Sequence, residues 1–202
     1  MKLRKSIILL ASVVALVMSV AASANASPAW KFNGTELTGK ETVVGAAISS
    51  SMTIPGATTE CKHFLYSMKI WNTSGTGKGE ITELPLFECT TNTTACTVAA
   101  IEAEKLPWAT HLTTIGTSDY IVVEGVRVAV EYTGKTCAVA GVQVVKGTAG
   151  GIIENTAQTA TFDKTTFTAT GTSLKDGATS VEWNGVFPTE AFESHREQAL
   201  EG

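Results

Sequence analysis

Three histidines are the residues of this chain best suited to acid–base or metal chemistry. They are His63, His111 and His195, each isolated in the sequence. Catalytic and zinc-binding histidines occur in spacings such as HExxH, and neither that motif nor GxSxG, SxxK or a calcium loop follows residue 26. Cys61-Lys62-His63 has two ligand types, but a disulfide is the better interpretation of the cysteine of an exported chain. We therefore predict no catalytic residue, no metal ligand and no cofactor.

Paired carboxylates are the second candidate chemistry, because glycosidases use two of them. Glu80 with Glu83, and Glu102 with Glu104, are close in sequence. Acidic residues are also expected on the solvent faces of strands in any acidic protein. We therefore favour a protein without enzymatic activity and keep an extracellular hydrolase acting on carbohydrate as the alternative.

Four tryptophans have two interpretations. Trp71 and Trp108 are the candidate binding residues, since an exposed indole can stack on a sugar ring, and Trp71 lies at the end of a predicted strand beside a glycine-rich turn. The alternative, which we favour for Trp30, Trp71, Trp108 and Trp183 alike, is that they anchor the core or loops, because buried aromatic rings contribute large apolar area.

The four cysteines straddle two turn-forming segments almost symmetrically. The midpoint of Cys61 and Cys89 is Gly75, and that of Cys96 and Cys137 falls between Gly116 and Thr117. Residues equidistant from a hairpin turn lie opposite each other, so these two pairs are preferred. Cys89 with Cys96 and Cys61 with Cys137, or the crossed pairing, remain alternatives because spacing alone does not decide connectivity.

The N-terminal segment and the charge predict the compartment. Residues 1–26 carry three basic residues, then an apolar run, then Ala24-Asn25-Ala26, which is typical of a signal peptide cleaved after Ala26. Without that segment 12 basic residues remain against 19 acidic, a formal charge of −7. We expect a secreted chain that neither binds nucleic acid nor inserts into a membrane.

The rest of the chain is rich in Thr, Val, Ile and Gly, which predicts an all-β fold. About ten short strands separated by turn residues indicate an antiparallel β-sandwich or partly open barrel. We expect one domain over residues 27–187 and a C-terminal helix or tail over 188–202. Residues 61–71 and 120–132 are the clearest strands. Residues 158–170 are also predicted as strand, with a tight reversal at 162–167.

The cysteine pattern resembles that of a group of small secreted proteins of soil actinobacteria. The resemblance spans roughly residues 45–170 and rests on Cys61 before a glycine-rich turn, Phe87-Glu88-Cys89, Cys96-Thr97, Leu106 to Trp108 and Cys137-Ala138-Val139. It implies a secreted bacterial β protein and assigns no site residue. The expected function is non-catalytic binding or a structural role at the cell envelope or outside the cell. The expected partner is a cell-wall or extracellular polysaccharide, or another protein.

Overall fold

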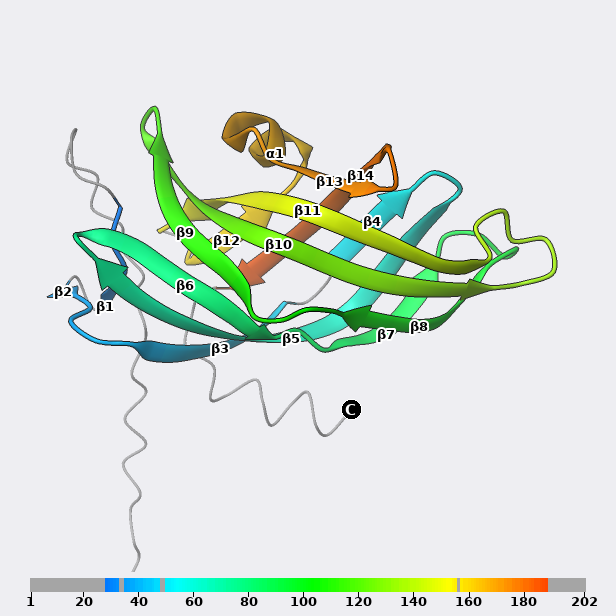
Figure 1. The fold of residues 1–202 in the computed structure, drawn as a ribbon, viewed down its shortest axis with the longest axis horizontal. Helices are drawn as coiled ribbons and strands as arrows, with labels where there is room; N and C mark the ends of the chain where they lie inside the picture. Colours follow the sequence, from blue (N-terminus) through cyan, green and yellow to red (C-terminus); the bar gives the residue numbers. More distant parts are fainter. Residues whose placement is uncertain (1–27, 33–34, 48–49, 156, 189–202) are drawn as a thin grey trace, which may run out of the picture.

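The computed structural model describes residues 28–32, 35–47, 50–155 and 157–188, which form an antiparallel all-β fold with one short helix (Figure 1). The all-β prediction is therefore confirmed. The elements are β1 (Lys31–Phe32), β2 (Thr35–Glu36), β3 (Glu41–Ala47), β4 (Ser50–Ile54), β5 (Ala57–Thr73), β6 (Thr76–Glu83), β7 (Leu86–Thr91), β8 (Thr97–Ala103), β9 (Trp108–Ile115), β10 (Ser118–Thr133), β11 (Gly141–Glu154), β12 (Thr159–Phe162), α1 (Lys164–Thr170), β13 (Ser173–Asp176) and β14 (Thr179–Pro188).

The main sheet closes on itself. Its hydrogen-bonded neighbours run β10, β9, β6, β5, β4, β14, β13 and β11, and β11 pairs again with β10. This ring is a barrel of eight strands, a size whose interior is filled by side chains or holds one small ligand. A barrel was one of the two architectures that the sequence predicts, and the ring of pairings is closed where a partly open one was expected.

The long strands β5 and β10 divide the barrel into two levels. At the first level β5 lies between β3 and β6, and β10 pairs with β9. At the second level β5 lies between β4 and β7, and β10 pairs with β8. β7 and β8 are close in space but no ladder joins them within the described residues. We call this contact between residues 86–91 and 97–103 the seam.

The two hairpin turns lie where the sequence predicts them. Thr73 pairs with Thr76 across Ser74-Gly75, and Ile115 pairs with Ser118 across Gly116-Thr117. Ser74 and Gly75 both have positive φ, 50° and 75°, as a two-residue type I′ hairpin requires. Strand β5 also has the predicted faces, with Phe64, Tyr66, Met68 and Ile70 buried and His63 and Lys69 exposed.

The predicted face of β10 is wrong in its first half. The sequence alternation places Tyr120 and Val122 with the later valines, whereas Ile121 and Val123 join Val126 in the core cluster. The physical reason is a bulge: from Val123 to Val126 β10 advances one residue more than β11, with Gly125 at φ 72°. One extra residue moves every preceding side chain to the opposite face.

The strand predicted for residues 158–170 is wrong after Phe162, because α1 follows. Asp163 caps the helix by accepting from the Thr166 backbone N–H at 2.7 Å, and the Thr166 hydroxyl accepts from the Asp163 N–H at 2.9 Å. Gly171 ends it with φ 67°. This capping box satisfies N–H groups of the first turn and outweighs the poor helix propensity of a threonine-rich segment.

Trp30 closes one end of the barrel. Its indole N–H donates to the Lys78 carbonyl at 2.8 Å, and its backbone N–H donates to Asn72 Oδ1 at 2.8 Å. Gly77 makes room for it, because a Cβ there would lie 2.5 Å from the side chain of Leu112 and 3.1 Å from that of Trp30. The segment that precedes β1 is thus a structural part of the core.

The predicted signal peptide, residues 1–26, lies outside the described residues. So does the predicted helix or tail of residues 188–202, except for Pro188, which ends β14. No helix within the described ranges has the length and apolar character needed to cross a bilayer.

Candidate functional site

A basic groove lies on the outer surface beside α1. Its volume is about 440 Å³, within the range of small-molecule sites. Its polar side chains come from two antiparallel neighbours, β11 and β13, and from Thr172 between α1 and β13. The lining residues are Lys146, Gly147, Thr148, Gly171, Thr172, Ser173, Lys175 and Gly177. We refer to this site as the basic groove.

The two lysines of the basic groove lie directly opposite each other in the β11–β13 ladder. The next residue in the same row is Arg127 on β10, which is opposite Lys146. The buried neighbours Val145 and Leu174 point inward, so the lysines point outward. Arg127 forms an ion pair with Glu104, whereas neither lysine has an acidic partner among the described residues. Like charges placed opposite each other destabilise a sheet, so this row carries unsatisfied positive charge.

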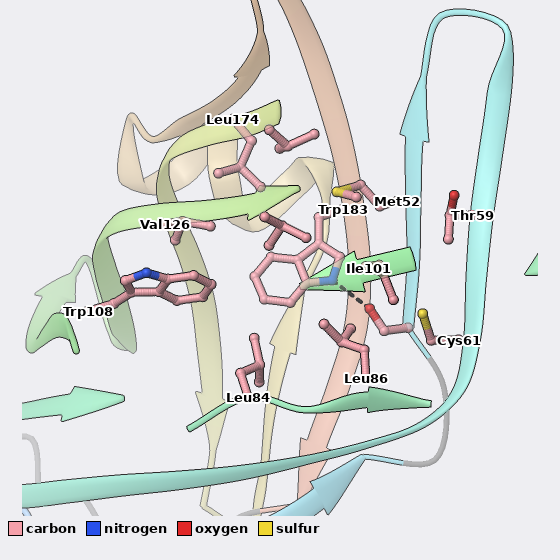
Figure 2. A pocket seen from close by; sticks show the side chains of 13 residues that line it. Met52, Thr59, Cys61, Leu84, Leu86, Ile101, Trp108, Val126, Leu174 and Trp183 are labelled. Carbon is pink, nitrogen blue, oxygen red and sulfur yellow. Dashed lines mark hydrogen bonds between the residues drawn. The ribbon is translucent and has the colours of Figure 1, made fainter. Parts of the chain in front are cut away.

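Two apolar cavities lie inside the barrel, one at each level. The cavity at the β7–β8 level has a volume of about 30 Å³ (Figure 2), and the cavity at the β6–β9 level about 50 Å³. Both are lined by Leu84, Trp108 and Trp183, so a single layer of three side chains separates them. We call this layer the septum. Phe162 and Phe187 pack around Trp183, with ring centroids 5.2 and 5.7 Å from it.

The polar groups that line these cavities are already hydrogen-bonded. In the septum the Trp108 indole donates to the Glu104 carbonyl at 2.9 Å, and the Trp183 indole donates to Ser50 Oγ at 2.6 Å (Figure 2). Tyr66 donates to the carbonyl of Pro188 at 2.6 Å, and burial raises the pKa of this phenol above its ordinary value. Each of these side chains thus has a hydrogen-bond partner, and most of the surface that the described residues present to the cavities is carbon and sulfur.

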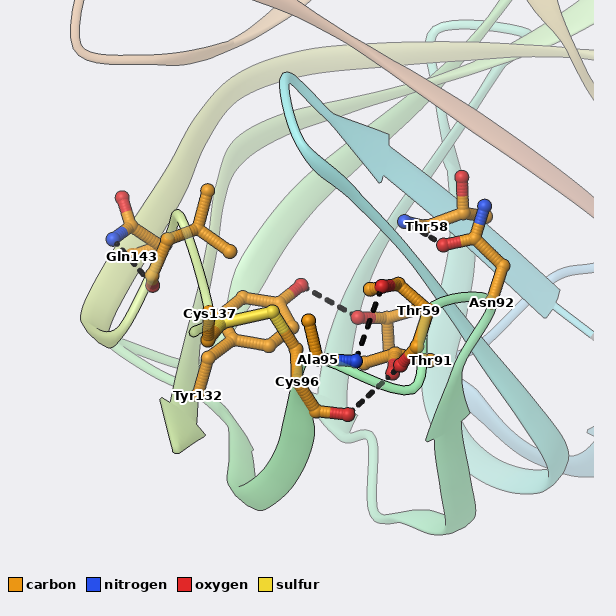
Figure 3. Close-up of a disulfide and its surroundings, with 11 residues drawn as sticks. Thr58, Thr59, Thr91, Asn92, Ala95, Cys96, Tyr132, Cys137 and Gln143 are labelled. Carbon is orange, nitrogen blue, oxygen red and sulfur yellow. Dashed lines mark hydrogen bonds between the residues drawn. A yellow bond between two sulfur atoms is a disulfide. The ribbon is translucent and has the colours of Figure 1, made fainter. Parts of the chain in front are cut away.

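A further buried hydrogen bond joins the Thr59 and Tyr132 hydroxyls at the β7–β8 level (Figure 3). Burial is the main cause of a raised pKa of Tyr132, opposed by this hydrogen bond, and Asp176 raises it further. Both tyrosines are consequently held in their neutral form.

The two tryptophans predicted as binding residues have different surroundings. Trp108 is 1 % exposed and lies in the septum, so its ring is not on the outer surface. Trp71 is half-buried near the end of β5, and Lys40 Nζ lies 4.3 Å from its ring centroid, a cation–π contact. The structure does not bring the two together, because Trp71 lines neither the cavities nor the basic groove.

The cysteines form Cys61–Cys89 and Cys96–Cys137, the two pairs that the symmetric spacing favours. Cys61 and Cys89 are opposite each other in the β5–β7 ladder, with Cα atoms 4.0 Å apart. The second bridge joins the residue before β8 to the turn after β10 (Figure 3). Cys61–Cys89 therefore links β7 to β5, and Cys96–Cys137 links the start of β8 to the turn that follows β10.

Among the described residues, the histidines and the paired carboxylates do not assemble into a site. His111 Nδ1 lies 3.2 Å from Glu124 Oε1 on the outer face, and neither residue lines a cavity described above. His63 is exposed on β5, and His195 lies outside the described residues. Among the predicted carboxylates, Glu80 contacts Lys69 at 3.8 Å and Glu104 pairs with Arg127. The part of the chain that the structure describes holds no group of three ligand-type residues able to bind a metal.

Comparison with known proteins adds no family assignment: no family model, curated protein or solved structure matches this chain. The class that the structure defines is therefore a disulfide-bonded antiparallel β protein with a closed, apolar interior and a basic groove.

Proposed function

We propose that this protein is a secreted, non-catalytic binding protein and that the basic groove binds anionic polymers outside the cell. The observation that carries the proposal is the pair Lys146 and Lys175, opposed in one ladder without an acidic partner in the described structure. A carboxylate or phosphate group between the two ammonium groups would replace repulsion by two charge-assisted contacts. The hydroxyls of Thr148, Thr172 and Ser173 add donors and acceptors suited to a glycan.

Other features support a location outside the cytoplasm for this proposed function. The predicted export segment and the two disulfides support a location outside the cytoplasm, where such bridges persist. The resemblance to secreted actinobacterial proteins supports a bacterial envelope or its surroundings. The predicted mature chain has a formal charge of −7, so most of its surface repels anions. The basic groove has the opposite charge and would attract anions to that one place.

The test is binding of the oxidised protein to polygalacturonate, to inorganic polyphosphate and to neutral dextran at low and high salt. We expect salt-sensitive binding to at least one polyanion and none to dextran, and the first two arms distinguish carboxylate from phosphate recognition. Lys146→Gln combined with Lys175→Gln should remove most of this binding. Lys62→Gln combined with Lys69→Gln, which removes two lysines already paired with Glu88 at 3.3 Å and with Glu80 at 3.8 Å, is the matched control and should retain it. Equal loss in both variants would mean that net charge, and not the groove, attracts the polymer.

The second candidate is an extracellular hydrolase acting on carbohydrate, and the His111–Glu124 contact is the observation in its favour. A histidine beside a carboxylate can act as a general base. This pair lies outside the basic groove and the interior cavities. Release of reducing ends from a polysaccharide, abolished by His111→Gln, would establish the hydrolase and displace the binding proposal.

A further inference from the structure

The free positive charge of the basic groove is confined to two residues. Lys146 and Lys175 are opposite each other, and neither has an acidic partner in the described structure. Arg127, the third cation of the same cross-strand row, is already paired with Glu104. Among the described residues that line the groove there is no other cation. One anionic group placed between the two lysines would therefore use all of the free positive charge.

The groove has room for more than that one group. Its volume of about 440 Å³ is within the range of sites that hold drug-sized molecules. Toward α1 it is lined by Thr148 and Ser173, which are opposite each other and two residues along their strands from the lysines. Two residues of a strand span about 7 Å. The unit next to the bound anion therefore faces this pair of hydroxyls, which we call the hydroxyl row and which can both donate to and accept from a neutral sugar.

A carboxylate lies at each end of the hydroxyl row. Glu182 follows the last β14 residue that pairs with β13, so it lies beside Ser173, and Lys164 balances its charge at 3.3 Å. At the other end the bulge of β10 faces Thr148 and carries Glu124. The ionic contact of Glu124 is with the histidine described above, which leaves the carboxylate charge uncancelled when it is neutral. The surroundings of the hydroxyl row are thus balanced or negative, and they favour a neutral group over an anion.

From these features we propose that the basic groove recognises an acidic sugar followed by a neutral one, as in glycans whose charged and uncharged sugars alternate. The acidic group lies between Lys146 and Lys175, and hydroxyls of the neutral sugar bond to Thr148 and Ser173. A second acidic group over the hydroxyl row is selected against, because it would find no free cation there. This inference rests on the proposed function and narrows its ligand from any anionic polymer to a sparsely charged glycan.

The test compares tetragalacturonate with the same tetrasaccharide in which alternate carboxyl groups are methyl esters, so that only the density of charge differs. Binding to the oxidised protein is followed by NMR shifts of the backbone amides of β11 and β13, which report the place of binding as well as the affinity. About 0.15 M salt limits the effect of distant charges, because the Debye length is then about 8 Å. We expect the half-esterified tetrasaccharide to bind about threefold more tightly, the effect of one unmatched charge at about 7 Å in water.

A pair of substitutions should reverse this preference. Ser173→Lys combined with Glu182→Gln places an unpaired cation in the hydroxyl row. It should tighten the binding of tetragalacturonate about fivefold, the upper range for an exposed ion pair, and change the affinity for the half-esterified form by less than about twofold. Thr90→Lys combined with Glu60→Gln is the matched control, because it makes the same change of charge at two exposed ladder partners of β7 and β5. The control should leave both affinities unchanged.

The outcomes separate this inference from the proposed function. If the unaltered protein binds the two tetrasaccharides equally, or the fully charged one more tightly, the inference is overturned and the groove remains a site for anions. Absence of amide shifts with both ligands would also overturn it, while the polymer test above decides the proposed function independently. An equal gain in the control variant would show that net charge sets the preference, which again overturns the inference. If the Ser173→Lys and Glu182→Gln variant does not fold, the comparison in the unaltered protein still decides.

Discussion

Replacing Lys146 by glutamine should stabilise the fold, although it removes a residue of the proposed binding site. Lys146 lies between Lys175 and Arg127 in one cross-strand row, and Arg127 is already paired with Glu104. The Cβ atoms of directly opposed residues are about 5 Å apart, and we take roughly 6 Å between the exposed ammonium groups. In water two charges at that distance repel by about 0.7 kcal/mol. We therefore expect the free energy of unfolding to rise by about 0.5–1 kcal/mol at low salt.

The assay is urea unfolding of the oxidised protein in about 0.01 M and about 1 M sodium chloride, where the Debye length falls from about 30 Å to about 3 Å. The gain of Lys146→Gln should nearly vanish at the higher salt. Lys62→Gln should have the opposite sign at low salt, a loss within about 0–1 kcal/mol, because it breaks the exposed contact with Glu88. A gain that survives high salt, or a loss of stability at low salt, would refute the reasoning from like charges.

Three further predictions concern other parts of the fold. Asp163→Ala should lower the free energy of unfolding by about 1 kcal/mol through loss of the helix cap, and Thr165→Ala, at an exposed position of α1, should change it little, as thermal unfolding would show. Because burial raises the pKa of Tyr66 in the folded state, its contribution to stability should be complete below pH 10 and decline as the pH rises further, and Tyr66→Phe should flatten that decline in a pH series of urea unfolding. Backbone amides of β7 and β8 should exchange with deuterium faster than those of β9 and β10, and equal rates in all four strands would contradict the account of the seam.

The sequence predicts the local features of this fold well. Ser74-Gly75 and Gly116-Thr117 each contain a glycine, which adopts the positive φ of tight turns at little steric cost, and hairpins form at both places. The alternation of Phe64, Tyr66, Met68 and Ile70 predicts the buried face of β5 because a strand has period two. Once the first turn is placed, Cys61 and Cys89 follow as opposite residues of antiparallel strands. Cys96 and Cys137 are not opposite each other, because they lie just beyond the β8–β10 ladder, which ends at Thr97 and Thr133.

What the sequence does not show depends on register between distant strands. The buried face of β10 changes at a single bulge, and the one residue in the sequence that indicates this bulge is Gly125. The helix after Asp163 was signalled by its capping pair Asp163 and Thr166, which the high threonine content obscured. The opposition of Lys146 and Lys175 arises only when β13 pairs with β11, so no local pattern reveals the basic groove. The septum likewise brings together three side chains from separate parts of the chain.

The placement of the two bridges limits how far this chain lengthens under tension. They span 28 and 41 residues, in segments that follow each other between β5 and the turn after β10. At about 3.5 Å per extended residue, these segments hold back about 10 nm and about 14 nm of contour length. A pulling force applied at the two ends therefore cannot extend residues 62–88 or residues 97–136, which stay inside closed loops until a sulfur–sulfur bond is cut. For a protein exposed to shear in its surroundings, this geometry acts as a built-in stop on extension.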